Sequence, residues 1–234
     1  MGLQNCISSA LDSRLFCWHN SKMVQQRSWG NLLYTVWDVF WITIDQKIST
    51  ARSRASLYLQ GCLFGSDFAT TGHCSFKARK KMSIQVGSHV RLLAGWRSNR
   101  VGLSGPVLLQ TFGIGEIEIG DSSGGSACVL SSRSKIMLGK HVNLGGNVRI
   151  YDHDFHALEP EFRRLGQKEQ EPHVRTSPVE IGDDVFVGAN AMILKGVRLG
   201  ARSIVAAGAV VFRGEYPPDC ILAGNPAQIV SSRK

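Results

Sequence analysis

The residues with the clearest chemical potential are two histidines that alternate with acidic and aromatic side chains in one short segment. That segment reads Tyr151-Asp152-His153-Asp154-Phe155-His156. An imidazole titrates near neutral pH, and an adjacent carboxylate fixes its tautomer and favours its protonated form during turnover. We therefore predict that His153 or His156 acts as a general base, with Asp152 as the partner that orients it.

The same histidines allow two other interpretations. In the first, they are polar loop residues that hold the loop in place by hydrogen bonds. In the second, they belong to a metal site that gathers histidines from neighbouring segments: His141, His153, His156 and His173. Spacing alone is weak evidence for such a site, and the chain has no CxxC pair. We expect no metal cofactor.

A six-residue repeat must position these side chains. From Ile181 onward every sixth residue is aliphatic: Ile181, Val187, Ile193, Leu199, Val205 and Val211. The same period appears at 138–150 and, more faintly, at 84–92 and 64–76. A helix would show a period of 3.6 and a single strand strict alternation. A period of six instead predicts an all-β fold of short strands and tight turns, stacked as a β-solenoid.

The repeat breaks off directly after Ile150, where the histidine segment begins. The next repeat residue, Ile181, lies 31 positions further on, one more than five repeats, and the intervening residues are strongly polar. A loop that leaves a rigid solenoid is a common place for function. We predict a solenoid domain over residues 62–230 with a protruding insertion at 151–177, preceded by an N-terminal segment at 1–61.

The N-terminal segment is predicted to contain a helix at 29–56. Apolar residues recur there at helical spacing: Leu33, Val36, Trp37, Phe40, Trp41 and Ile44. The expected role is a cap on the first coil, and membrane-surface contact is the less favoured alternative. The chain shows neither a membrane-spanning apolar run nor a secretion signal. With six scattered cysteines read as reduced thiols, this favours a cytoplasmic location.

Charge is distributed unevenly along the chain. The net charge is +9, and residues 1–110 hold 13 Lys and Arg against 4 Asp and Glu, whereas residues 111–234 hold 14 of each. Such an excess suits a polyanionic neighbour or simply a solvated basic face. Because no nucleic-acid-binding motif accompanies the charge, we expect no nucleic acid partner.

The repeat over residues 62–230 resembles that of the hexapeptide-repeat acyltransferases. The resemblance implies a left-handed parallel β-helix with three hexapeptides per coil, and a homotrimer. In the galactoside and maltose acetyltransferase-like members, the catalytic histidine follows a strand of the repeat and starts an extended loop, the place that His153 holds. Polysaccharide acetyltransferases are similar in an Asp-x-Asp-Phe-His segment followed by Arg, here Asp152–His156 and Arg163. This makes His156 the rival base, and Asp154 and Arg163 candidate substrate-binding residues.

The C-terminal stretch resembles the part of these enzymes that ends the β-helix and helps to form the coenzyme A channel. It includes Gly224-Asn225-Pro226-Ala227. By the same resemblance, coenzyme A would contact Phe186, Gly188, Ala189, Ala206, Ala207 and Gly208 between neighbouring subunits. The family's basic residues after Pro-Ala are missing here, where the chain reads Gln228-Ile229-Val230. Their candidate substitutes near the coenzyme A phosphates are Lys195, Arg198 and Arg213.

The resemblance implies an acetyl-CoA-dependent O-acetyltransferase that acts on a sugar hydroxyl in surface polysaccharide or lipopolysaccharide synthesis. Two alternatives stay open. One is an N-acyltransferase of an amino sugar nucleotide, and the other is a non-catalytic β-helix that serves as an assembly scaffold.

Overall fold

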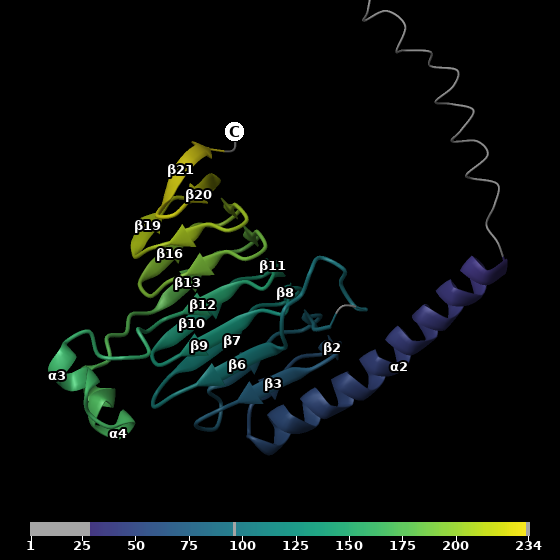
Figure 1. Ribbon diagram of the computed structural model, residues 1–234, viewed down its shortest axis with the longest axis horizontal. Helices are drawn as coiled ribbons and strands as arrows, with labels where there is room; N and C mark the ends of the chain where they lie inside the picture. Colours follow the sequence, from purple (N-terminus) through teal and green to yellow (C-terminus); the bar gives the residue numbers. More distant parts are fainter. Residues whose placement is uncertain (1–28, 96, 233–234) are drawn as a thin grey trace, which may run out of the picture. The chain divides into compact units, whose positions relative to one another are not determined.

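The computed structural model describes residues 29–95 and 97–232, in which three sheets are wound into a parallel β-helix (Figure 1). Sheet A contains β1 (Leu63–Phe64), β4 (Ile84–Val86), β7 (Glu116–Ile119), β10 (Lys135–Leu138), β13 (Val179–Ile181), β16 (Val197–Leu199) and β19 (Gly214–Tyr216). Sheet B contains β2 (Ala69–Thr71), β5 (Arg91–Leu93), β8 (Gly124–Ser126), β11 (Asn143–Gly146), β14 (Phe186–Val187), β17 (Ile204–Val205), β20 (Cys220–Gly224) and β21 (Ala227–Ser232). Sheet C contains β3 (Cys74–Lys77), β6 (Val107–Thr111), β9 (Val129–Ser132), β12 (Arg149–Tyr151), β15 (Met192–Ile193) and β18 (Val210–Val211).

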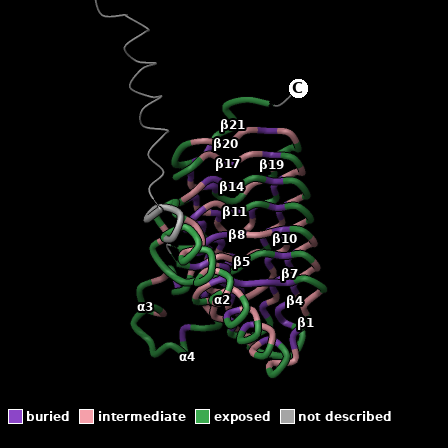
Figure 2. Tube along the Cα trace, turned by 90° about the vertical axis from the view of Figure 1, so that its right-hand side faces the viewer, coloured by how far each residue is buried: buried purple, intermediate pink, exposed green. Residues whose placement is uncertain are grey.

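The chain visits the sheets in the constant order A, B, C, so each strand pairs in parallel with the strand three places earlier. Figure 2 shows the coils one above another, with the buried positions on their inner side. Only the final hairpin departs from this pattern, because β21 runs antiparallel to β20. The arrangement is consistent with the predicted left-handed β-helix.

The six-residue period is the inward-facing row of this helix. All six aliphatic residues from Ile181 to Val211 are buried in one core, none more than 3% exposed. Pairing keeps them in register: Ile181 lies opposite Leu199, and Ile193 opposite Val211. The faint trace at 64–76 is also real, because Phe76 pairs with Leu109 in sheet C. Stacking like residues on successive coils buries a continuous apolar column.

Helix α2 (Trp29–Leu59) is the predicted N-terminal helix and runs three residues beyond the expected end at 56. Its C-terminal part belongs to the compact unit that begins at Ile42. Leu57 is fully buried, Ser53 Oγ lies 2.9 Å from Thr70 Oγ1, and Arg54 donates two hydrogen bonds to the carbonyl of Phe68. This part of α2 therefore caps the first coil, and Arg54 serves the cap rather than an open basic surface.

The N-terminal part of α2 carries the aromatic residues of the helical pattern. Trp37, Phe40 and Trp41 contact one another, with ring centroids 5.6 to 6.3 Å apart. Trp37 is 59% exposed within the described chain. None of the described helices is long and apolar enough to cross a membrane.

The insertion leaves the β-helix after β12 and returns at β13. It contains α3 (Pro160–Arg163), α4 (Gln167–Gln170) and the short helix η1 (Glu171–His173). The ring of His173 in η1 stacks on the ring of Phe162 in α3, at a centroid distance of 3.5 Å. This contact holds the first and the last of the three helices together. The root of the insertion is closed by a bridge between His153 and Thr176. The insertion is thus a small folded unit anchored beside the histidine segment.

Candidate active site

The candidate site lies at the edge where strands of sheet C lead into sheet A, which we call the C–A corner. On successive coils this corner consists of Lys77–Arg79, Thr111–Gly113, Ser132–Ser134, Asp152–Asp154, Leu194–Lys195 and Phe212–Arg213. Parallel stacking places these segments next to one another in that order, although they are distant in sequence.

Asp152 is the buried anchor of the corner. Its carboxylate accepts hydrogen bonds from Ser132 Oγ (2.7 Å) and from the backbone N–H groups of Arg133 and Ser134 (both 2.8 Å). Its own carbonyl oxygen accepts from Thr176 Oγ1 and from the backbone N–H of Ser177, both at 2.8 Å. A residue with 0% exposure and this many donors has one fixed orientation.

His153 is oriented by that carboxylate. Its Nδ1 lies 3.0 Å from Asp152 Oδ1, and both side chains are fully buried. Because a carboxylate accepts hydrogen bonds, Nδ1 carries the proton and Nε2 keeps its lone pair. Nε2 is buried and has no partner in the described structure. An unpaired, correctly oriented imidazole nitrogen is the form that a general base requires.

Two aromatic rings enclose the imidazole of His153. The ring centroid of Phe155 is 4.3 Å away and that of Phe112 is 5.8 Å away. Phe155 has a φ of 63°, in the left-handed region where a bulky residue is rare, and it is 39% exposed. Backbone strain of this kind concentrates at functional sites. Phe155 is therefore the exposed side of the enclosure around His153.

His156 has different surroundings. It is exposed, and its Nδ1 lies 3.1 Å from the side-chain oxygen of the buried Gln170 in α4. The partner is a neutral amide, which fixes a tautomer but offers little stabilisation to an imidazolium. The backbone N–H of Ala157 also donates to this oxygen, at 3.3 Å. The contact between His156 and Gln170 thus connects the beginning of the insertion to helix α4, which lies later in the same insertion.

The two candidate substrate-binding residues, Asp154 and Arg163, also lie in different surroundings. Asp154 pairs with Lys195 of the next coil, and its second oxygen, Oδ2, is buried without a partner. Arg163 is exposed and donates to the carbonyl of Leu158 at 3.1 Å, within the insertion itself. Within the described chain no contact joins Arg163 to His153, so the structure brings only Asp154 to the C–A corner.

Most of the predicted coenzyme A residues lie at a different edge, where sheet B leads into sheet C. This B–C corner contains Phe186, Gly188, Ala189, Ala206, Ala207 and Gly208. Phe186 is 43% exposed, and the space beside the Cα of Gly208 is open. Gly188 is required by packing, since a Cβ there would come within 2.5 Å of the backbone nitrogen of Ala207. This corner is therefore lined by exposed apolar and small residues.

Sheet C separates the B–C corner from His153 within one chain. Of the residues predicted to contact coenzyme A or its phosphates, Lys195 and Arg213 lie at the C–A corner, one and two coils beyond the histidine. The guanidinium of Arg213 has no ion pair in the described chain. Lys195 is bound to Asp154 and Arg198 to Glu180, so these two substitutes are already occupied.

The four histidines of the metal interpretation do not converge. His141 lies before β11 at another corner, His156 faces Gln170, and His173 stacks on Phe162. No cluster of three or more metal-ligating side chains occurs within residues 29–95 and 97–232.

The described cysteines are free thiols: Cys62, Cys74, Cys128 and Cys220. Burial raises the pKa of Cys74 and of Cys128 to about 12. Such thiols carry almost no thiolate at neutral pH, so neither is an activated nucleophile. Cys6 and Cys17 lie outside the described residues.

Comparison with known proteins supports the repeat and its chemistry. Residues 178–213 match the family model described as the hexapeptide repeat of succinyl-transferase. The chain covers 81% of a hexapeptide-repeat acetyltransferase from Vibrio cholerae solved with acetyl-CoA, at 26% identity over 82% of this chain and a TM-score of 0.52. The chain is similar to hexapeptide-repeat acyltransferases.

Other acyltransferases match shorter or more distant parts. A candidate acetyltransferase of Saccharomyces cerevisiae is 36% identical over 44% of this chain, which spans 48% of that protein. The tetrahydropyridine-dicarboxylate N-acetyltransferase of Staphylococcus aureus is 54% identical over 54 residues, 23% of this chain and 22% of that enzyme. The N-acyltransferase AntD of Bacillus cereus shares the fold, with a TM-score of 0.55 and 19% identity over 76% of this chain and 87% of AntD.

Sequence reasoning missed the residues that fix the histidine. Ser132, Arg133 and Ser134 were not singled out, because they lie about 20 positions before Asp152 and show no catalytic spacing. The available signal was the extra residue in the coil from Ile119 to Leu138, which marks an irregular turn at this corner.

Proposed function

We propose that the chain is an acetyl-CoA-dependent acetyltransferase that uses His153 as general base to acetylate a sugar hydroxyl. The observation that carries the proposal is the unpaired Nε2 of a buried imidazole whose Nδ1 is held by Asp152. The similarity to an acetyltransferase of known structure along most of the chain supports the acyl donor.

In this mechanism, acetyl-CoA supplies the activated acetyl carbonyl. His153 Nε2 takes the proton from the acceptor hydroxyl as its oxygen attacks that carbonyl. The imidazolium that forms is stabilised by the Asp152 carboxylate at 3.0 Å. His153 then returns the proton to the departing thiolate, so no covalent enzyme intermediate is needed. Phe155 must swing aside to admit the hydroxyl, because Nε2 is buried.

His156 is assigned a positioning role rather than the role of the base. Its Nδ1 faces the amide of Gln170 and its ring is exposed, whereas the ring of His153 is buried and its Nδ1 faces a carboxylate. We assign Asp154 and Lys195 to the acceptor side of the site. Asp154 Oδ2 is a buried acceptor that can receive a hydrogen bond from a sugar hydroxyl.

Acyl transfer at His153 requires the donor site of a neighbouring subunit in this proposal. The apolar B–C corner, from Phe186 to Gly208, is one sheet away from His153 in the same chain. A threefold assembly in which the B–C corner of one subunit faces the C–A corner of the next would complete the site. We therefore propose a homotrimer with three shared active sites.

N-acylation of an amino sugar is the second candidate function. The observation that favours it is the 54% identity to an N-acetyltransferase over 54 residues. An amine acceptor would use the same base, since a protonated amine must also lose a proton before or during attack.

The test measures free coenzyme A released from acetyl-CoA with a panel of sugars, amino sugars and their nucleotide derivatives. We expect acceptor-dependent release by the wild type, and a turnover lower by about 10²–10⁴ for His153→Ala. His156→Ala is the matched control and should lose less than tenfold. Equal losses in both variants, or loss only in His156→Ala, would contradict the assignment of the base. Product analysis by mass spectrometry distinguishes an ester from an amide.

A further inference from the structure

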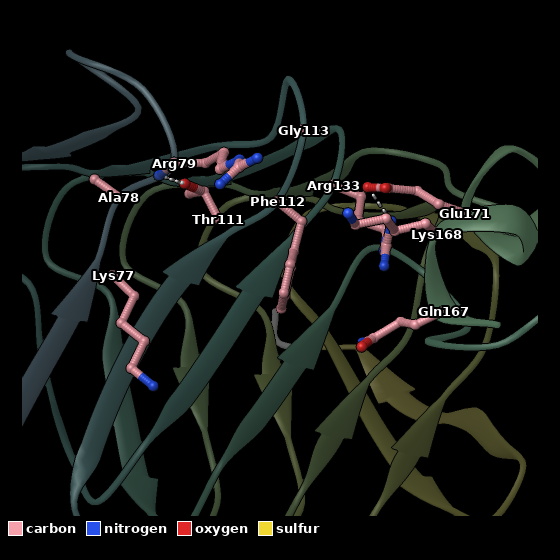
Figure 3. Close-up of a pocket in the computed structure, with 10 residues that line it drawn as sticks. All are labelled: Lys77, Ala78, Arg79, Thr111, Phe112, Gly113, Arg133, Gln167, Lys168 and Glu171. Carbon is pink, nitrogen blue, oxygen red and sulfur yellow. Dashed lines mark hydrogen bonds and ion pairs between the residues drawn. The ribbon is translucent and has the colours of Figure 1, made fainter.

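A cavity of about 350 Å³ lies at the C–A corner, beside His153 but on earlier coils. Its walls come from the ends of β3, β6 and β9 and from α4 of the insertion. The side chains that matter for its chemistry are Lys77, Arg79, Phe112, Arg133, Lys168 and Glu171. Figure 3 shows Lys77 and Arg79 on one side of Phe112, and Lys168 on the other beside Arg133 and Glu171.

The cavity is strongly basic, with four cationic side chains against the single carboxylate of Glu171. That carboxylate is already paired with Arg133 Nη1 at 3.1 Å. The charged groups of Lys77, Arg79 and Lys168 have no acidic partner in the described chain. Four cations around one cavity repel one another, and a bound anion relieves that repulsion.

Arg133 is built into the wall of this cavity. Its side chain is only 14% exposed, and its guanidinium lies 5.1 Å from the centre of the Phe112 ring. The Nε–H of Arg133 is buried and has no hydrogen-bond partner in the described structure. A buried guanidinium with a free donor is suited to a carboxylate or phosphate oxygen.

Two connections join this cavity to the base. The ring of Phe112 lines the cavity, and its centroid is 5.8 Å from that of His153. The backbone N–H of Arg133 donates to the same carboxylate that orients His153. A molecule with one group bound at Arg133 that extends past Phe112 would therefore place its neighbouring groups near the Nε2 atom of His153.

The order of the coils indicates which substrate the cavity serves. The cavity uses the coils of β3, β6 and β9, the base follows β12, and the residues proposed for coenzyme A lie on the coils of β14 to β18. The base therefore lies between the cavity and the donor side. An anion at the cavity belongs to the acceptor rather than to the phosphates of coenzyme A.

We propose that this cavity binds an anionic group of the acceptor, a carboxylate or a phosphate, so that the substrate is an acidic saccharide. The identification of the bound molecule as the acceptor rests on the proposed acetyltransferase function. The binding of an anion in the cavity does not depend on turnover. The insertion helix α4 contributes Gln167 and Lys168 to the wall of the cavity.

The binding experiment uses glucuronate, glucose 6-phosphate and glucose with the full chain in ligand-detected NMR. The charge-removal variant is Lys77→Gln/Lys168→Gln, and the matched control is Lys140→Gln, an exposed lysine outside the cavity. We expect the two anions to bind and glucose not to bind. Binding should weaken about tenfold or more in the double variant, weaken as salt is raised, and persist in Lys140→Gln and in His153→Ala. The stronger of the two anions identifies the group.

The kinetic experiment compares an acidic saccharide with its neutral counterpart. We expect the double variant to raise KM for the acidic acceptor about tenfold with kcat nearly unchanged, and to leave the neutral acceptor unaffected. Equal anion binding by the wild type and the double variant, or no anion binding by either, overturns the proposal. Anion binding without any His153-dependent transfer would overturn the proposed function and leave the anion site standing.

Discussion

His153 Nδ1 lies 3.0 Å from Asp152 Oδ1, and the opposite ring nitrogen, Nε2, is buried without a partner. The carboxylate is itself held by Ser132 and by two backbone N–H groups of the preceding coil. The imidazole therefore has its tautomer and direction set by the β-helix rather than by the insertion. This coupling of a loop histidine to a rigid coil is the basis of the first prediction.

Asp152→Asn should lower turnover by about 10²–10⁴, because an amide can turn its N–H toward Nδ1 and leave the proton on Nε2. Steady-state kinetics with the identified acceptor measure the effect. Ser132→Ala is the control, since it removes one of the carboxylate's donors but keeps the carboxylate, and should cost less than tenfold. A fully active Asp152→Asn enzyme would show that the contact with Asp152 does not set the tautomer.

The ring of Phe155 lies 4.3 Å from that of the buried His153, whereas His156 is exposed, so the two histidines should differ in chemical reactivity. Diethyl pyrocarbonate should modify the exposed His156 quickly and the enclosed His153 slowly. Phe155→Ala should raise the modification rate of His153 severalfold and leave that of His156 unchanged. Peptide mapping by mass spectrometry resolves the two sites. Rapid modification of His153 in the wild type would mean that the ring does not shield it.

The cap on the first coil predicts a localised stability effect. Leu57→Ala should lower the free energy of unfolding by about 2–5 kcal/mol, because Leu57 is fully buried against the coil. Leu59→Ala, at an 82% exposed position two residues later, should change it by less than ~0.5 kcal/mol. Urea unfolding followed by circular dichroism compares the two. Similar effects from both would argue against the cap.

Shared active sites predict complementation between inactive subunits. His153→Ala removes the base, and Ala207→Trp fills the B–C corner while leaving the base intact. Each homotrimer alone should be inactive, and a 1:1 mixture reassembled from unfolded chains should recover about one quarter of wild-type activity. Light scattering checks the trimer beforehand. A monomer, or a mixture without recovery, would mean that donor and base belong to one chain.

The raised thiol pKa values predict unreactive cysteines. With a pKa of about 12, Cys74 and Cys128 carry roughly one thiolate in ten thousand at pH 8. Iodoacetamide should therefore label them only after unfolding. Because folding raises these pKa values above the ordinary 9.0, the native state loses stability as pH rises from about 9 to about 12. Native-state labelling at the rate of a free thiol, measured by mass spectrometry, would contradict the burial.

The sequence alone determined the β-helix, because its evidence is repeated in every coil. An inward aliphatic residue at every sixth position reports a local requirement of the strand and turn, and stacking follows from it. The six-residue spacing from Ile181 to Val211 therefore predicted that these side chains are buried, and its interruption after Ile150 predicted the insertion. The helix predicted at 29–56 also rested on a local sequence pattern, and the structure extends it by three residues.

Only the tertiary structure decided which histidine is buried against a carboxylate and what surrounds it. From the residues alone, both His153 and His156 stayed candidates for the base, because each lies close to an acidic side chain in the sequence. Their difference arises because one faces a carboxylate fixed by Ser132 and Arg133, whereas the other faces Gln170. Likewise, the basic cavity is lined by both Lys77 and Lys168, which are 91 residues apart in the sequence. Where loops leave the helix, the coils differ in length, so the register between those coils and the contacts that depend on it emerge only from packing.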